Sequence, residues 1–262
     1  MSEPNILVDT DARGVATVAL NRPDVRNAFD EHLIADLTGA LRRLETDPAV
    51  QIVVLTGNGS SFSSGGDLDW MGRMARYSDA ENFADAMALA ELLRILNELP
   101  KPTLARVNGP AFAGGLGLVC CCDIAVAAAD AIFSVSEVRL GLVPATISPY
   151  VVAALGARAA RRYFQTGERF SAAEAQRIGL VHEVAPADQL DRAVETLVAA
   201  LLEGGSGAQA RSKRLIAEVQ DRPITEAMLT LTARAIAEAR ASAEAREGLA
   251  AFFAKRKPAW RR

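Results

Sequence analysis

Short apolar runs broken by polar residues predict β-strands in the first half of the chain. Residues 5–10 and 14–20 are rich in strand-forming residues, and residues 11–13 between them are typical of a hairpin turn. Residues 51–56, QIVVLT, are almost all apolar, as expected of a strand buried on both faces. Further strands are predicted over 103–107, 124–129 and 131–135.

Apolar residues at spacings of three and four predict helices between these strands. The first helix follows Asp30, whose side chain is placed to cap it. Its apolar positions are Leu33, Ile34, Leu37, Leu41 and Leu44. A second helix over about 79–99 is ended by Pro100 and Pro102, and a third, which starts with glycine, covers 114–122.

From Ser148 onward the pattern is mostly helical, with helix start signals at Ser171 and Thr225. Strands and helices alternate in residues 1–200, which predicts an α/β core. Residues 201–262 predict an appended helical region. No flexible linker separates the two parts, so we expect the helices to pack on the core.

Composition narrows the class of protein. The 262 residues carry a net charge of −3, whereas a nucleic-acid-binding protein usually has a basic surplus, so we expect no nucleic-acid partner. The longest apolar stretch, 111–122, is too short and glycine-rich to cross a membrane, and the acidic N-terminus lacks the apolar core of a signal peptide. Cysteines 120–122 suit neither a disulfide framework nor a metal site, which favours the reducing cytoplasm.

Several mechanisms lack the residues that they need. The sequence contains no phosphate-binding loop, no dinucleotide-binding fingerprint and no G-x-S-x-G nucleophile turn. Its two histidines, His32 and His182, are interpreted as surface or structural residues rather than bases. A metal site and a Ser-His-Asp triad are therefore disfavoured.

Two glycine turns are the first candidates for chemistry. One covers residues 62–67 and the other residues 113–115, and each joins a predicted strand to a helix. Backbone N–H groups at such junctions lack partners, and the helix dipole favours negative charge there. If the turns face one another, they can donate two hydrogen bonds to one developing oxyanion. The alternative is that both are ordinary tight connections.

Glu137 is the candidate acid or base. It follows a short strand and precedes Gly141 and Pro144. A carboxylate in an apolar setting has a raised pKa and can transfer protons. The alternative is a solvated glutamate that pairs with Arg139.

These motifs have an order and spacing that resemble the crotonase (enoyl-CoA hydratase/isomerase) superfamily over essentially the whole chain. The residues that carry the resemblance are 20–23, 27–29, 62–68, 101–103, 107–115, 122–125, 133–144, 173–175 and 179–181. The resemblance implies an α/β fold, a crotonase-like spiral of ββα turns, with a C-terminal helical trimerisation region. It also implies an acyl-CoA thioester substrate, no metal, and no cofactor apart from the CoA of the substrate.

The resemblance assigns roles to individual residues. The N–H groups of Gly66 and Gly114 match the oxyanion hole of the family. The remaining assigned residues are substrate-binding: Arg26, Asn27 and Ala28 match the segment beside CoA, Asp67 and Leu68 help to shape the pocket, and Gly117 belongs to the same set.

One departure bears on the reaction. Family hydratases carry two glutamates; Glu137 matches the second, and the first falls at Gly117, where we expect open space. The chain most resembles bacterial methylglutaconyl-CoA and isohexenylglutaconyl-CoA hydratases, which share this glycine, at residues 115–118, 121–123, 136–139, 147–149, 159–163 and 247–260. We therefore expect water addition to the 2,3-double bond. The alternatives are a single-glutamate double-bond isomerase and a non-catalytic acyl-CoA binder.

The C-terminal region carries more apolar positions than a peripheral helix needs. They are Met228, Leu229, Leu231, Ile236, Leu249, Phe252 and Phe253. We expect a neighbouring subunit to cover part of them in a homotrimer or a dimer of trimers. Lys255 and Lys257 then either approach a CoA phosphate or form a solvated tail.

Overall fold

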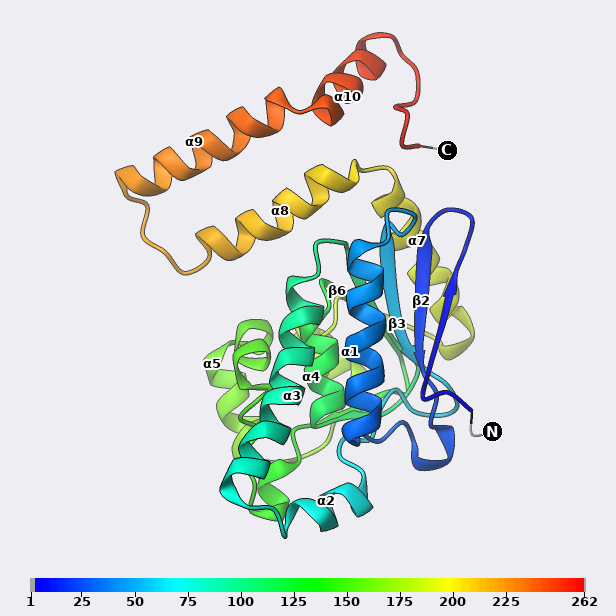
Figure 1. Ribbon diagram of the computed structural model, residues 1–262, viewed down its shortest axis with the longest axis vertical. Helices are drawn as coiled ribbons and strands as arrows, with labels where there is room; N and C mark the ends of the chain where they lie inside the picture. Colours follow the sequence, from blue (N-terminus) through cyan, green and yellow to red (C-terminus); the bar gives the residue numbers. More distant parts are fainter. Residues whose placement is uncertain (1–2, 262) are drawn as a thin grey trace.

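A six-stranded sheet forms the centre of the protein. The computed structural model describes residues 3–261 (Figure 1). The strand order is β1-β2-β3-β4-β6-β9. The strands are β1 (Ile6–Thr10), β2 (Val15–Leu20), β3 (Ile52–Gly57), β4 (Thr103–Val107), β6 (Ile124–Ala128) and β9 (Glu183–Ala185). β1 and β2 form the predicted antiparallel hairpin, and all later neighbours pair in parallel.

A second sheet of three short strands lies beside the first. Its order is β5 (Ala111–Phe112), β7 (Ile132–Ser134) and β8 (Phe170–Ser171). The chain passes from β4 to β5 and then into α4 (Gly114–Cys121), and it passes again from β6 to β7. This repeated passage between the two sheets produces the predicted spiral of ββα turns.

Helices cover both faces of the six-stranded sheet (Figure 1). Val53 and Leu55 of β3 pack in the cluster that contains α1 (Glu31–Thr46), α3 (Asp79–Glu98) and α4. Ile52 and Val54 point to the opposite face, where α7 (Leu190–Leu202) packs. Because side chains alternate along a strand, both faces of β3 are apolar, as its sequence predicts.

The predicted helix starts are confirmed by their caps. Asp30 accepts a hydrogen bond from the N–H of Leu33 at 2.8 Å, and the predicted apolar positions of α1 are all buried. Ser171 caps α6 (Ala172–Arg177), and Thr225 caps α9 (Glu226–Ala241). A polar side chain that satisfies a free N–H group at each start fixes where these helices begin.

Two further helices flank the site described below. α2 (Leu68–Met74) follows the first glycine turn, and α5 (Ser148–Thr166) follows the segment that carries Glu137. Gly156 interrupts α5 with a φ of 73°. Within residues 3–261, no helix combines the length and the apolar character needed to cross a membrane.

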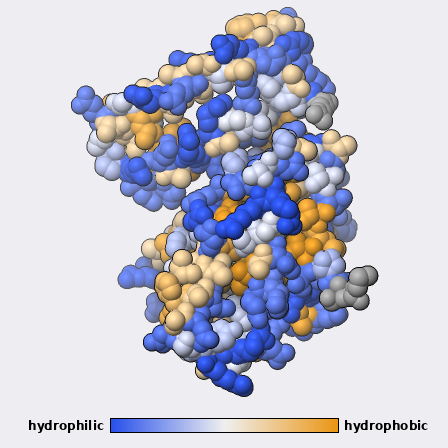
Figure 2. Space-filling view, in the orientation of Figure 1, coloured by the Kyte–Doolittle hydropathy of each residue, from blue (hydrophilic) through white to orange (hydrophobic). Residues whose placement is uncertain are grey.

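The last three helices lie beyond one end of the sheet, opposite α2 (Figure 1). They are α8 (Ser206–Val219), α9 and α10 (Ala243–Phe253). In the part of the chain that the structure describes, α8 and α9 bury no residue and α10 buries only Ala251. Phe252 and Phe253 are 76% and 78% exposed. Figure 2 shows this lobe standing away from the body on one side, with apolar residues among the charged ones.

Candidate active site

The segment that precedes α1 packs directly against the first glycine turn. Arg26 and Asn27 both have a φ of 55°, a left-handed conformation that asparagine adopts more readily than most residues. The buried amide of Asn27 donates to the carbonyls of Asn58 and Ser61, both at 2.9 Å, and accepts from the N–H of Arg22 at 2.8 Å. Asn27 is 0% exposed, so its side chain is an internal anchor of this segment.

Arg22 connects this segment to the start of α2. Its guanidinium lies 3.0 Å from Asp30 and 3.1 Å from Asp67, and it donates to the carbonyl of Ala28 at 2.6 Å. Asp67 also caps α2 by accepting from the N–H groups of Asp69 and Trp70. Charge-assisted hydrogen bonds of this kind are strong, so they hold the turn that precedes Asp67 in one place.

The two predicted glycine turns are in contact. The carbonyl of Ser63 accepts from the N–H of Phe112 at 2.9 Å, and Ser63 forms a parallel bridge with Ala111. A Cβ added at Gly65 would lie 3.0 Å from the Cβ of Ala113. Glycine therefore allows the backbones of the turns to approach one another.

The N–H groups of Gly66 and Gly114 are unpaired in the part of the chain that the structure describes. Neither has a hydrogen-bond acceptor within residues 3–261. Gly114 is the first residue of α4, where no intrahelical acceptor exists and the helix dipole favours an anion. Both glycines contact Phe29, Gly66 through a backbone bridge and Gly114 through close packing against its ring. The structure thus brings together the two turns that the sequence predicts as the oxyanion hole.

Glu137 emerges from the strand that pairs with the second turn. β5 and β7 pair Phe112 with Ser134, and the carbonyl of Ser134 accepts from the N–H of Ala113. Glu137 begins the 3₁₀ helix η2 (Glu137–Leu140) three residues later. Its Oε2 is buried without a hydrogen-bond partner among the described residues, and burial raises the pKa of its carboxyl. No ion pair joins it to Arg139 in residues 3–261.

Comparison with known proteins agrees with this architecture. The enoyl-CoA hydratase/isomerase family matches residues 10–262. The chain belongs to this family. An enoyl-CoA hydratase structure from Shewanella pealeana has a TM-score of 0.95 and 43% identity, with 98% of this chain and 96% of that chain covered.

Two curated relatives are named for different acyl-CoA substrates. The crotonyl-CoA hydratase of Syntrophomonas wolfei is 32% identical over 260 residues, which cover 98% of each chain. The hydroxycinnamoyl-CoA hydratase-lyase of Pseudomonas fluorescens is 34% identical over 204 residues, which cover 72% of this chain and 70% of the relative. The predicted membership of the crotonase superfamily and the predicted fold class are confirmed.

The predicted open space at Gly117 is wrong. A Cβ at this position would lie 2.4 Å from Cγ2 and 3.0 Å from Cβ of Ile147. Ile147 is 1% exposed, so its side chain fills the volume that a first family glutamate would need. The sequence gives no sign of this contact, because the two residues are thirty positions apart.

The other predicted residues have simpler surroundings. Leu68 is 81% exposed at the start of α2, where a substrate can reach it. His182 is structural, as predicted, because its Nδ1 accepts from the N–H of Ala125 at 3.1 Å. His32 is exposed on α1. Arg22 has a clear structural role that sequence reasoning missed, although it lies within one of the motifs that resemble the family.

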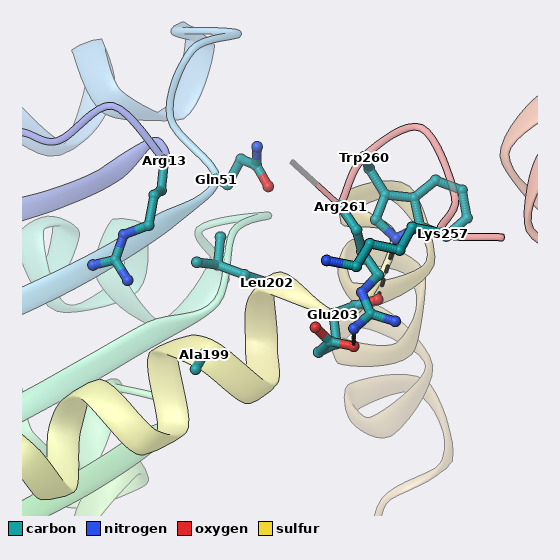
Figure 3. Close-up of a pocket in the computed structure, with 8 residues that line it drawn as sticks. All are labelled: Arg13, Gln51, Ala199, Leu202, Glu203, Lys257, Trp260 and Arg261. Atoms are coloured by element: carbon teal, nitrogen blue, oxygen red, sulfur yellow. Dashed lines mark hydrogen bonds and ion pairs between the residues drawn. The ribbon is translucent and has the colours of Figure 1, made fainter.

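Lys257 lies at the opposite end of the sheet from the two glycine turns. It lines a pocket with Arg13 and Gln51, and Figure 3 shows it facing these residues from the C-terminal tail. Gln51 precedes β3 and Asn58 follows it, so a six-residue strand, which spans about 20 Å, separates this pocket from the first turn. Lys257 therefore lies far from its own candidate oxyanion hole.

Proposed function

We propose that this member of the family is an enoyl-CoA hydratase that adds water to the 2,3-double bond of an acyl-CoA thioester. The observation that carries the proposal is the buried, unpartnered Oε2 of Glu137, which follows the strand that pairs with the second of two contacting turns, whose Gly66 and Gly114 N–H groups have no acceptor in residues 3–261. Such a combination suits the formation of an enolate and the transfer of a proton to or from it.

In the proposed mechanism, the thioester oxygen accepts hydrogen bonds from Gly66 and Gly114. Water adds to C3 as Glu137 takes one of its protons, and negative charge moves from the double bond onto the thioester oxygen. Protonated Glu137 then returns the proton to C2, so the water is fully accounted for. The raised pKa of Glu137 supports both roles, because a carboxyl closer to neutrality in pKa gives and accepts protons with similar ease.

The proposed acyl group is methylglutaconyl or a related branched chain. This choice rests on the resemblance of the sequence to hydratases that also have glycine at the position of Gly117. The names of the relatives, crotonyl-CoA hydratase and hydroxycinnamoyl-CoA hydratase-lyase, support acyl-CoA chemistry in general.

The mechanism requires no further cofactor, since the thioester itself accepts the developing charge. The free cysteines support a cytoplasmic location as part of the same proposal.

Isomerisation remains the second candidate, because the site presents one carboxylate and Ile147 fills the place of another. Incubation with 2-enoyl-, 3-enoyl- and methylglutaconyl-CoA distinguishes the candidates. Hydration increases the product mass by one water, whereas isomerisation of the 3-enoyl ester changes its retention time but not its mass. Binding without either conversion would contradict both and indicate an acyl-CoA binder.

We also propose a homotrimer or a dimer of trimers. The support comes from α9 and α10, where Leu229, Ile236, Phe252 and Phe253 are at least half exposed. Exposed apolar side chains that gather in one region often mark a surface that a partner covers. As part of the same proposal, Lys257 approaches a CoA phosphate bound to a neighbouring subunit. Light scattering should show the oligomer, and a stable monomer would contradict this proposal.

A further inference from the structure

The segment that carries Glu137 has few fully buried residues. After Val135, the next buried residues in this fully described segment are Pro144 and Ile147. Leu140 and Val143 between them are 63% and 73% exposed. The N–H of Leu142 donates to the carbonyl of Glu137 at 3.1 Å, which closes the short helix on itself without tying it to another element.

Ile147 joins the end of this segment to α4. It precedes the first turn of α5 and is 1% exposed. Its Cγ2 and Cβ occupy the space in front of Gly117, where no Cβ fits. Gly117 lies in the first turn of α4, and its N–H donates to the carbonyl of Ala113 at 3.0 Å. Since residues three apart share one face of a helix, Ile147 packs one turn from Gly114.

We propose that Ile147 is a positioning residue. Its β-branched side chain fills the space left by the missing Cβ of Gly117, and it thereby fixes the acid/base carboxylate of Glu137 relative to the N–H of Gly114. This inference rests on the proposed function and deepens it. Apart from Ile147, the Glu137 segment is held by the buried residues Val135 and Pro144 and by Val138 and Arg139, whose side chains lie beside Gly167 at the end of α5. Small displacements of a catalytic group are costly, because an error of about 1 Å can lower the rate by about a hundredfold.

The first experiment tests the contact without requiring activity. Gly117→Ala should lower the midpoint of denaturant unfolding in the wild-type background, because its Cβ meets Ile147. In an Ile147→Ala background, which removes the closer contact with Cγ2, the same substitution should lower the midpoint much less. Equal effects of Gly117→Ala in the two backgrounds would overturn the proposed packing of Ile147 against Gly117.

The second experiment tests positioning. Ile147→Val keeps Cβ and Cγ2, the two contacting atoms, whereas Ile147→Ala removes Cγ2. Val151→Ala is the matched control, since Val151 is equally buried one turn further along α5. We expect Ile147→Ala to lower kcat about 10- to 100-fold with little change in KM. Ile147→Val should remain near wild type, and Val151→Ala should lose stability but keep kcat.

A third measurement follows the protonation of the Glu137 carboxyl directly. Its titration can be followed by the carboxyl infrared band that disappears in Glu137→Gln. Ile147→Ala should lower the midpoint of this titration, because a loosened segment admits water to the carboxylate, whereas Val151→Ala should leave it in place. An unchanged midpoint in Ile147→Ala, or equal losses of kcat in Ile147→Ala and Val151→Ala, would overturn the proposal. A wild-type protein that hydrates no enoyl-CoA would contradict the proposed function, while the unfolding and infrared results would still decide the role of Ile147.

Discussion

The two sides of the candidate site are held in different ways. The N–H side is fixed by hydrogen bonds, because the buried amide of Asn27 bonds to three backbone groups and Arg22 joins Asp30 to Asp67. The carboxylate side depends on packing, since Glu137 lies in a mostly exposed segment that Pro144 and Ile147 anchor. The N–H donors must be rigid to stabilise charge, whereas the proton carrier must lie beside the reacting carbon and exchange its proton.

Removing the carboxylate should produce the largest effect. Glu137→Gln keeps the size of the side chain but cannot transfer a proton, so we expect turnover to fall by about 10²–10⁴-fold. Binding of an acyl-CoA should remain largely intact, because Gly66 and Gly114 still bind the carbonyl. Steady-state kinetics and calorimetric binding measure the two quantities. Near-normal turnover in the variant would contradict the proposed role of Glu137 in hydration and in isomerisation alike.

Removing one N–H donor should have the next largest effect. Gly114→Pro deletes the N–H group at the first position of α4, where the ring breaks no intrahelical hydrogen bond, and we expect about a 10²–10³-fold loss of kcat. Gly114→Ala is the control, because any Cβ at this position would meet the ring of Phe29 at 2.8 Å. Both variants should therefore lose stability, but only the proline variant should show the full loss of kcat. Similar kcat values for the two would remove Gly114 from the proposed oxyanion hole.

Removing the hydrogen bonds of the Asn27 side chain, which hold the N–H side of the site, should lower stability. Asn27→Ala leaves buried backbone groups without partners and places alanine at a positive φ, which should cost about 3 kcal/mol of unfolding free energy. Asn21→Ala removes amide hydrogen bonds at a partly exposed site nearby and serves as the control. Denaturant titration measures both. Losses of equal size would show that the buried amide is not the main anchor.

The smallest expected effect concerns pH. Burial raises the pKa of Glu137 in the folded protein above that of a solvated glutamate. The folded state therefore binds this proton more tightly, and the resulting stability is present below the unfolded pKa and lost as pH rises through the folded pKa. Glu137→Gln cannot ionise, so it should be more stable than wild type at neutral pH, with a difference that shrinks towards pH 4. A constant difference across this range would indicate that the carboxylate is solvated.

Local sequence signals identified most of the elements but not their contacts. Asp30 and Thr225 marked helix starts, because a capping side chain acts within three residues. The two-residue strand β5 is too short to have a pattern of its own. The contact between the glycine turns depends on pairing Ser63 with Ala111, which the residue types do not reveal.

In the candidate site, too, local sequence predicts the individual residues but not the contacts between them. Glu137 and the two glycine turns were recognisable from residue type and order. The expectation of open space at Gly117 failed because it depended on one position alone, whereas the volume belongs to Ile147 from another helix. Arg22 was read only as part of a motif, since its partners Asp30 and Asp67 lie eight and forty-five residues away along the sequence.

The buried thiols at the end of α4 offer a way to follow the site in solution. Cys121 and Cys122 are buried, and burial raises the pKa of both thiols. Alkylating reagents attack the thiolate, so labelling requires this helix to open and expose them. Because α4 begins at Gly114, a ligand that binds its N-terminus should slow the labelling of its C-terminus. Alkylation rates with and without an acyl-CoA would therefore report occupancy of the oxyanion hole in an unmodified enzyme.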